Sequence, residues 1–161
     1  MPDSAKASAP RAIICAWLIA GCLDISSAFA IYLSRGITLT RGLQGIAIGL
    51  LGREAAVTGG VATAALGLGI HFFIMLCVVL VFFVATRCLR GLTRHPVWSG
   101  IIYGPIVYFV MYWIVVPLSR IGPRPHTLSN DALAVAIHIC LIGLPISLII
   151  ARFARPKVSY V

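Results

Sequence analysis

Four long apolar segments divide this chain of 161 residues, and its polar positions gather mainly between them. Crossing a bilayer takes about 20 apolar residues, because an α-helix rises 1.5 Å per residue and the hydrocarbon core is about 30 Å thick. The segments that reach this length are residues 12–33, 59–86, 97–118 and 132–151. The pattern therefore predicts an all-α polytopic membrane protein, with four transmembrane helices bundled into a single domain.

A fifth apolar run, within about residues 40–52, is too short to cross a bilayer. Its glycines recur every three or four residues, which places them on one face of a helix: Gly42, Gly45, Gly49 and Gly52. Small residues let helices approach closely in lipid, so helix packing is the favoured interpretation of this stripe. A phosphate-binding loop is less favoured, because the chain contains no GxGxxG or Walker pattern. We expect an interfacial or re-entrant helix between the first and second spans.

Three ionisable side chains, Asp24, His71 and His138, each lie in the middle of an apolar segment. An ionisable group in hydrocarbon costs a few kcal/mol, so such groups are rare and usually mark a site or a partner. Together with Tyr108, these residues lie 13 to 16 positions from a basic residue at one end of their span: Asp24 from Arg11, His71 from Arg87, Tyr108 from Arg94 and His138 from Arg152. These separations are roughly 20 to 24 Å along a helix. We therefore expect one polar layer, a little beyond the midplane.

Small residues share a helical face with the polar side chains. Residues three and four positions apart lie on one face, and small residues mark faces that contact protein rather than lipid. The glycines on these faces are Gly60 and Gly67 before His71, and Gly100 and Gly104 before Tyr108. The polar layer is therefore predicted to face the inside of the bundle, with these glycines in helix packing.

Several chemical roles are open to such a layer. The favoured interpretation is structural, with the histidines bonded to Asp24, Tyr108 or backbone carbonyls to fix helix register. Proton or cation handling is the first alternative, because ionisable chains across a bundle form relays. A metal bound by His71, His138 and Asp24, or a haem b clamped by the two histidines, is the second. No catalytic residues are predicted, since no nucleophile and base occur at a recognisable spacing, and an enzyme is the least supported class.

Composition and charge support the membrane interpretation. Hydrophobic residues make up 60% of the chain, charged residues only 11%, and the mean hydropathy is +1.03. The 13 Lys and Arg residues are spread over termini and loops, so the isoelectric point near 10.0 predicts contact with lipid headgroups rather than nucleic acid. Eight of them fall on the side that carries both termini and five on the other side. The positive-inside rule then predicts cytoplasmic termini.

The N-terminal segment allows two other interpretations. Basic residues followed by an apolar run resemble a secretory signal, and Ile19-Ala20-Gly21-Cys22 resembles a lipoprotein cleavage site. The apolar run continues beyond Asp24 to Leu33, which exceeds the ~7–15 residues of a signal core, so we expect the first span to be retained. The five cysteines form no CxxC pair and are expected to be packing residues. A transport path would require this small bundle to form a homo-oligomer or to bind another membrane protein.

The order of short motifs resembles a widespread group of small bacterial four-span membrane proteins for which no activity is established. The segments that carry the resemblance are Ala20-Gly21-Cys22-Leu23-Asp24, Leu43-Gln44-Gly45-Ile46-Ala47, Gly49-Leu50-Leu51-Gly52, Gly67 to His71-Phe72, Tyr103-Gly104, Val116-Pro117-Leu118-Ser119, and His138 with Gly143-Leu144-Pro145. The resemblance covers residues 12–151. It implies a location in the bacterial inner membrane and supports retention of the first span, but it brings no catalytic role with it.

Overall fold

The computed structural model describes residues 3–154, with side chains from residue 9 onward, and these residues form helices joined by short turns. Four helical stretches are long and apolar enough to cross a membrane: Ala9–Ser34, Gly60–Cys88, Pro96–Leu118 and Leu128–Ala154. Each coincides with a predicted span to within about one helical turn. The all-α, four-helix fold class is confirmed, and no strand occurs within residues 3–154.

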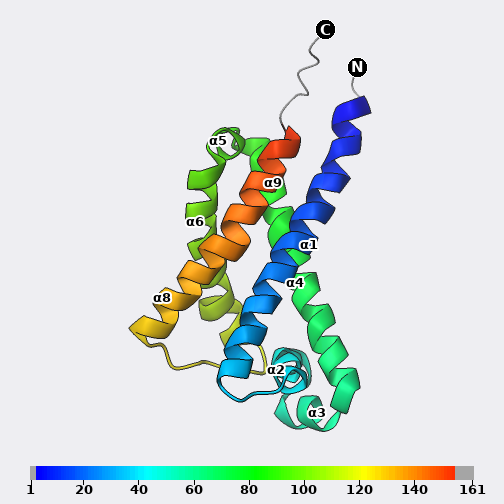
Figure 1. Cartoon of the computed structure of the whole chain (residues 1–161), viewed down its shortest axis with the longest axis vertical. Helices are drawn as coiled ribbons and strands as arrows, with labels where there is room; N and C mark the ends of the chain where they lie inside the picture. The colour runs from blue at the N-terminus through cyan, green and yellow to red at the C-terminus, as the bar shows by residue number, and fades with distance from the viewer. Residues whose placement is uncertain (1–2, 155–161) are drawn as a thin grey trace.

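The first two spans are continuous helices, α1 (Asp3–Ser34) and α4 (Gly60–Cys88). The third combines α6 (Pro96–Phe109), the π-helix η1 (Val110–Val115) and α7 (Val116–Leu118). The fourth combines α8 (Leu128–Ile137), the π-helix η2 (His138–Gly143) and α9 (Leu144–Ala154). Both ends of the described chain lie at the same end of the bundle, which we call the terminal end; the other is the distal end (Figure 1).

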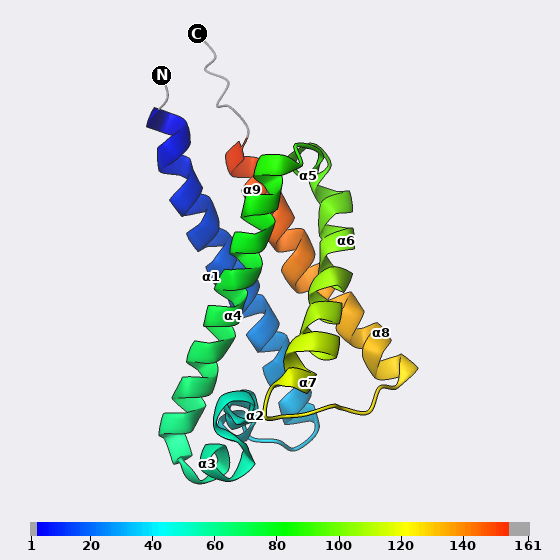
Figure 2. The same ribbon diagram turned by 180° about the vertical axis from the view of Figure 1, so that it is seen from behind.

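Three short helices complete the fold. A turn joins α4 to α6 at the terminal end and contains α5 (Gly91–Arg94). At the distal end, α2 (Leu39–Leu51) and α3 (Arg53–Thr58) connect α1 to α4. Both ribbon views show α2 nearly end-on, so it runs across α1 and α4 rather than alongside them (Figures 1 and 2). A short helix between the first and second spans is therefore present, as predicted.

Two local signals fix the bounds of α2. The Thr38 side chain accepts a hydrogen bond from the backbone N–H of Arg41 and caps the first turn. Gly52 ends the helix with φ at +84°, a conformation that costs glycine little because it has no Cβ. Between these ends, α2 packs against α4, and the buried Gln44 side chain donates to the Gly60 carbonyl at 3.0 Å. The crosswise helix is thus tied to the start of the second span.

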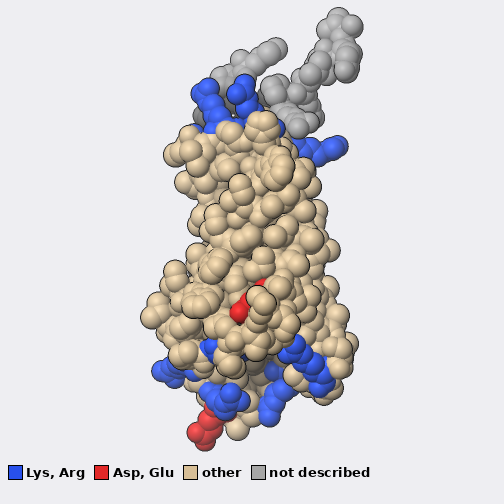
Figure 3. Space-filling model, turned by 90° about the vertical axis from the view of Figure 1, so that its left-hand side faces the viewer, with Lys and Arg blue, Asp and Glu red and all other residues tan. Residues whose placement is uncertain are grey.

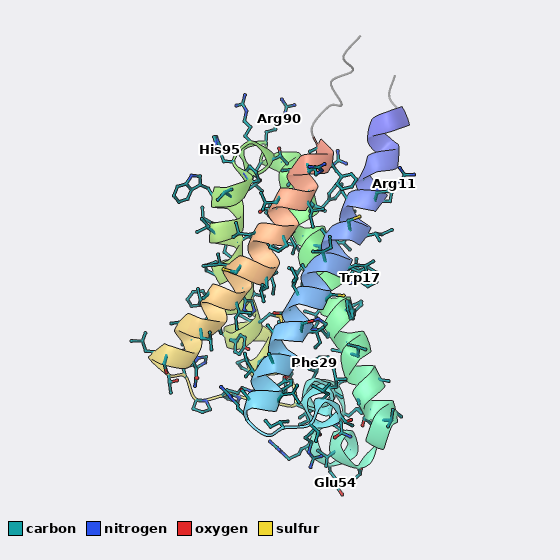
Figure 4. All side chains as sticks on the ribbon, viewed as in Figure 1. Arg11, Trp17, Phe29, Glu54, Arg90 and His95 are labelled. Carbon is teal, nitrogen blue, oxygen red and sulfur yellow. The ribbon has the colours of Figure 1, made fainter. Side chains whose placement is uncertain are left out.

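The main apolar core lies between the middle of the bundle and its terminal end. It consists of Ala16, Ala20, Met75, Val79, Phe82, Val107, Ile142, Ile146 and Ile150. Because α1 and α6 begin at the terminal end while α4 and α9 end there, all of these residues lie on the terminal side of the predicted polar layer. Figure 4 shows Arg11, Arg90 and His95 at the terminal end and Glu54 at the distal end.

Basic side chains gather at both ends of the molecule and leave a band without them between (Figure 3). The described arginines of the terminal end are Arg11, Arg87, Arg90, Arg94 and Arg152; those of the distal end are Arg35, Arg41, Arg53, Arg120 and Arg124. Arg155, Lys157 and the Lys6 side chain, which also enter the predicted charge count, lie outside the described part of the structure. This band without basic side chains, in which Figure 3 shows one patch of acidic atoms, is the surface expected to face hydrocarbon.

Close helix packing depends on glycine in the second, third and fourth spans. A Cβ built on Gly67 would collide with the backbone carbonyl of Leu43 in α2. A Cβ on Gly104 would lie 2.6 Å from the Cα of Ile139, and one on Gly100 would lie 2.7 Å from the Cα of Leu144. These contacts are with backbone, which cannot move aside as the end of a side chain can. Any larger residue would therefore push the helices apart.

The glycines of the predicted stripe serve different roles instead of forming one packing surface. A Cβ on Gly42 would collide with the Tyr32 ring, whereas one on Gly49 would make only ordinary contacts with Ser119 and Ile121 at 3.6 Å. Gly52 is a helix end. In the described structure, a Cβ on Gly45 would meet no atom within 4 Å.

Gly60, expected on the His71 packing face, also makes no close approach, and its φ of +60° explains its identity instead. A regular spacing of glycines thus says less about packing than the position of the neighbouring helix does.

The substitution Gly67→Ala should lower the free energy of unfolding by roughly 1–3 kcal/mol, the usual cost of overpacking, since the Leu43 carbonyl must shift. Gly45→Ala is the matched control and should be neutral or stabilising, because alanine is the better helix former by about 1 kcal/mol. Denaturant titrations followed by circular dichroism in detergent would compare the two. Equal effects at both positions would contradict the α2–α4 packing described above.

Candidate functional site

Each of the four predicted polar residues comes from a different helical segment. Asp24 lies on α1, His71 on α4 and Tyr108 on α6, while His138 is the first residue of η2. His71, Tyr108 and His138 are buried, and the Asp24 side chain is 23% exposed. The structure pairs Asp24 with His71 and Tyr108 with His138 in the middle of the bundle, and we call these four residues the polar centre.

His71 links α1 to α4. Its Nε2 lies 3.0 Å from the carbonyl oxygen of Gly21, which can only accept, so this nitrogen carries a hydrogen and donates it. The other ring nitrogen, Nδ1, lies 4.0 Å from Oδ2 of Asp24. Asp24 is three residues after Gly21, so one face of α1 presents both groups to the imidazole.

A second bond crosses the same helix pair one turn nearer the terminal end. The indole Nε1 of Trp17 donates to the carbonyl of Phe72 at 2.7 Å. The Phe72 ring packs edge-on against Trp17 and covers Gly21, where a Cβ would lie 2.7 Å from it. Gly21 and Trp17 were not predicted as site residues. Gly21 lies three positions before Asp24, on the same face of α1, and its small size is the sequence signal for this close approach.

His138 is held by its own helix. Its Nδ1 lies 2.8 Å from the carbonyl oxygen of Ala134 and must donate to it, so Nε2 carries the lone pair when the ring is neutral. The rings of Tyr108 and Tyr112 pack edge-on against the imidazole, with centroid distances of 5.8 and 6.0 Å. Asp24 lies within electrostatic range of both His138 and His71, which makes it the residue common to the two histidines.

Both π-helices adjoin the polar centre, and each ends just before a proline. Pro117 follows η1 and Pro145 follows η2, and proline has no N–H with which to continue an α-helical ladder. The backbone N–H groups of Val116 and Leu144 instead bond five residues back, to Met111 and Ile139. Such wide turns inside α-helices are rare overall, and those that occur are often found at functional sites. Tyr112 lies within η1, and His138 is the first residue of η2.

A second set of polar groups lies on the distal side of the polar centre. Nδ1 of His126 lies 3.2 Å from Oδ1 of Asp131, and the His126 ring stacks on Trp113 at 4.4 Å. The Tyr108 hydroxyl is buried and has no hydrogen-bond partner in the described structure. Asp131 precedes His138 by seven residues, so two helical turns place both on one face. This spacing is visible in the sequence, although Asp131 was not among the predicted site residues.

Metal binding has less support from this geometry. In the described part of the chain, no three His, Cys, Asp or Glu side chains are grouped closely enough to hold one metal ion. His71, His138 and Asp24 thus do not form a ready-made ligand set, and haem binding stays a prediction. Of the five free cysteines, four are exposed and Cys15 is partly buried, so they are not interior packing residues as expected.

The donor and acceptor pattern describes what the polar centre can do. Each histidine commits one ring N–H to a backbone carbonyl and keeps a second nitrogen able to take up a proton. Asp24 offers a carboxylate beside one of these nitrogens. The site is therefore a set of acid–base groups in a medium of low dielectric, where the position of each proton matters strongly.

No family model matches the chain, no curated protein is found to be similar to it, and no solved structure matches it. The geometry of the polar centre is consequently the main basis for assigning a function.

Tyr103 and Tyr108 of α6, the first partly buried and the second buried, should respond differently to loss of their hydroxyl groups. The Tyr103 hydroxyl donates to the carbonyl of Val78 at 2.7 Å, so Tyr103→Phe should destabilise the bundle by about 0.6 kcal/mol, the average for interhelical bonds in membranes. Tyr108→Phe should cost less or stabilise, because its hydroxyl has no protein partner. Unfolding titrations in detergent test this difference, and a greater loss for Tyr108→Phe would contradict it.

Proposed function

We propose that this multi-pass membrane protein uses its polar centre to bind and exchange a proton. Asp24, His71 and His138 are the groups that take up the proton. The function is one of proton binding linked to the state of the membrane protein, rather than catalysis on a soluble substrate.

The Asp24–His71 pair is the observation that carries this proposal. Because Nε2 of His71 donates to Gly21, a neutral ring presents only a lone pair at Nδ1. A lone pair and an ionised carboxylate 4.0 Å apart repel each other, and the protein interior screens this repulsion far less than water does. A proton on either group turns the contact into an attraction. The pair is therefore most stable when it holds a proton, and small changes around it move that proton on or off.

We place the protein in a bacterial inner membrane, with the terminal end in the cytoplasm. The resemblance to small bacterial four-span proteins supports the membrane. The count of eight basic residues against five supports the orientation.

A purely structural polar centre is the second candidate. The bond from His71 to the Gly21 carbonyl favours it, since this bond ties α1 to α4 whether or not a proton is exchanged. Interhelical bonds of this kind contribute only about 0.6 kcal/mol each, less than the roughly 3 kcal/mol cost of an intramembrane charge. Fixing register alone would be achieved at lower cost by Asn or Ser than by Asp.

Infrared difference spectra of the protein in lipid nanodiscs, taken between about pH 8 and pH 5, should show a protonated carboxyl band that grows as the pH falls. Asp24→Asn should abolish the band because it removes the only described acidic residue in the middle of a span. Glu54→Gln is the matched control and should leave the band unchanged, since Glu54 is exposed at the distal end.

A band of constant size across this pH range would support the structural candidate and reject proton exchange. A visible haem spectrum or a stoichiometric metal in the same sample, lost on substitution of both histidines, would instead favour a cofactor.

A further inference from the structure

We propose that protons reach the polar centre from the distal end alone, by way of His126, Asp131, Tyr108 and His138. This inference rests on the proposed function and adds a direction to it. In the conformation described here, the polar centre exchanges protons with one compartment and is closed to the other.

The terminal side of the polar centre is closed by packed apolar side chains. Met75, Val79 and Phe82 follow His71 along α4, and Ile142, Ile146 and Ile150 follow His138; all six are buried. Ala20 and Ala16 complete the layer from α1. Val79 lies eight residues after His71, a distance of about 12 Å along the helix. A single hydrogen bond cannot cross this distance.

Four polar side chains of this closed region are hydrogen-bonded to backbone carbonyls. Trp17 and Tyr103 donate to the backbone carbonyls of Phe72 and Val78. Ser99 and Ser147 donate to carbonyls of their own or adjoining helices. None of these four side chains takes up a proton at neutral pH, so they offer no relay toward the terminal end.

The distal side has the opposite character. His126 and Asp131 form a partly exposed pair 3.2 Å apart at the start of α8, where water can reach them. Asp131 lies two helical turns before His138 on one helical face, and the Tyr108 ring packs edge-on against His138 with a centroid distance of 5.8 Å. His138 in turn lies within electrostatic range of Asp24, beside His71. Ionisable groups thus continue from the surface to the polar centre.

The Tyr108 hydroxyl is the informative member of this series. It is a buried polar group with no hydrogen-bond partner among the described side chains and backbone, on a residue only 2% exposed. Buried hydroxyls are rarely left unpaired in proteins, and a bound water is a common partner. A water at this hydroxyl would join Asp131 to the region of His138, so the orphan group marks the step that side chains alone do not bridge.

The charges around this route favour a proton over a metal cation. Tyr32 of α1 and Tyr112 of η1 lie within range of Asp24, and Arg124 of the distal loop lies within range of both tyrosines. The positive charge of Arg35 also lies within electrostatic range of Tyr32. The positive charges of these distal guanidinium groups would repel a hydrated cation, whereas a proton can move by exchange along hydroxyl, carboxyl and imidazole groups.

Labelling with dicyclohexylcarbodiimide tests the direction, because this reagent modifies carboxyl groups that are protonated and in apolar surroundings. The protein is reconstituted in liposomes, and vesicles with the C-terminal tag outside are separated from those with the tag inside. The internal pH is held by trapped buffer while the external pH is changed between about 8 and 5. Modification of Asp24 is then read by mass spectrometry shortly after each change.

We expect the modification of Asp24 to follow the external pH only in vesicles whose distal end faces outward. A prompt response in both orientations, or only with the terminal end outward, would overturn the proposed direction while leaving proton binding intact. If the modification of Asp24 does not change with pH in either orientation, the proposed function itself is overturned. The two failures are therefore distinguishable.

A paired variant tests the route. Asp131→Asn combined with His126→Gln should slow the response of Asp24 by at least about tenfold, since a positioned acid–base group typically speeds proton transfer by more than that. Glu54→Gln, which removes a distal carboxylate outside the route, should respond as the wild type does. An unchanged rate in the paired variant would overturn the assignment of His126 and Asp131.

Discussion

The free-energy cost of an ionisable group in hydrocarbon is the constraint from which the rest of this structure follows. Asp24, His71 and His138 would each cost a few kcal/mol if they faced lipid alone. The structure lowers this cost by bringing them together and by bonding both imidazoles to backbone carbonyls. Because the three residues come from different helices, their grouping also fixes how those helices are aligned.

That grouping requires helices that approach closely and turn at the correct positions. Gly21 lets α1 approach the Phe72 ring, and Gly104 brings α6 against the backbone at the start of η2. Tyr112 and His138 belong to the π-helices, which occur where Pro117 and Pro145 interrupt the α-helical ladder. The functional geometry thus depends on glycine and proline residues that carry no chemistry themselves.

Sequence reasoning predicted the spans, the short helix between the first two of them and the residues of the polar centre, because hydrocarbon length and the rarity of membrane charges are strong signals. It assigned the glycines of residues 42–52 to helix packing, but their spacing alone does not locate the contacts: in the described structure a Cβ on Gly45 would meet no atom within 4 Å, and Gly52 ends a helix. The π-helices, the unpartnered Tyr108 hydroxyl and the His126–Asp131 pair were not predicted. These features depend on how segments far apart in the chain meet, which local spacing does not encode.

The contact between Asp24 and His71 is the central claim, and solid-state NMR of the protein in lipid bilayers tests it most directly. We predict a through-space correlation between the Asp24 carboxyl carbon and Nδ1 of His71, together with a protonated, hydrogen-bonded Nε2 on the same ring. Loss of Nε2 bonding, or an Asp24 carboxyl with no correlation to His71 while neighbouring pairs such as Trp17 and Phe72 give theirs, would contradict the account.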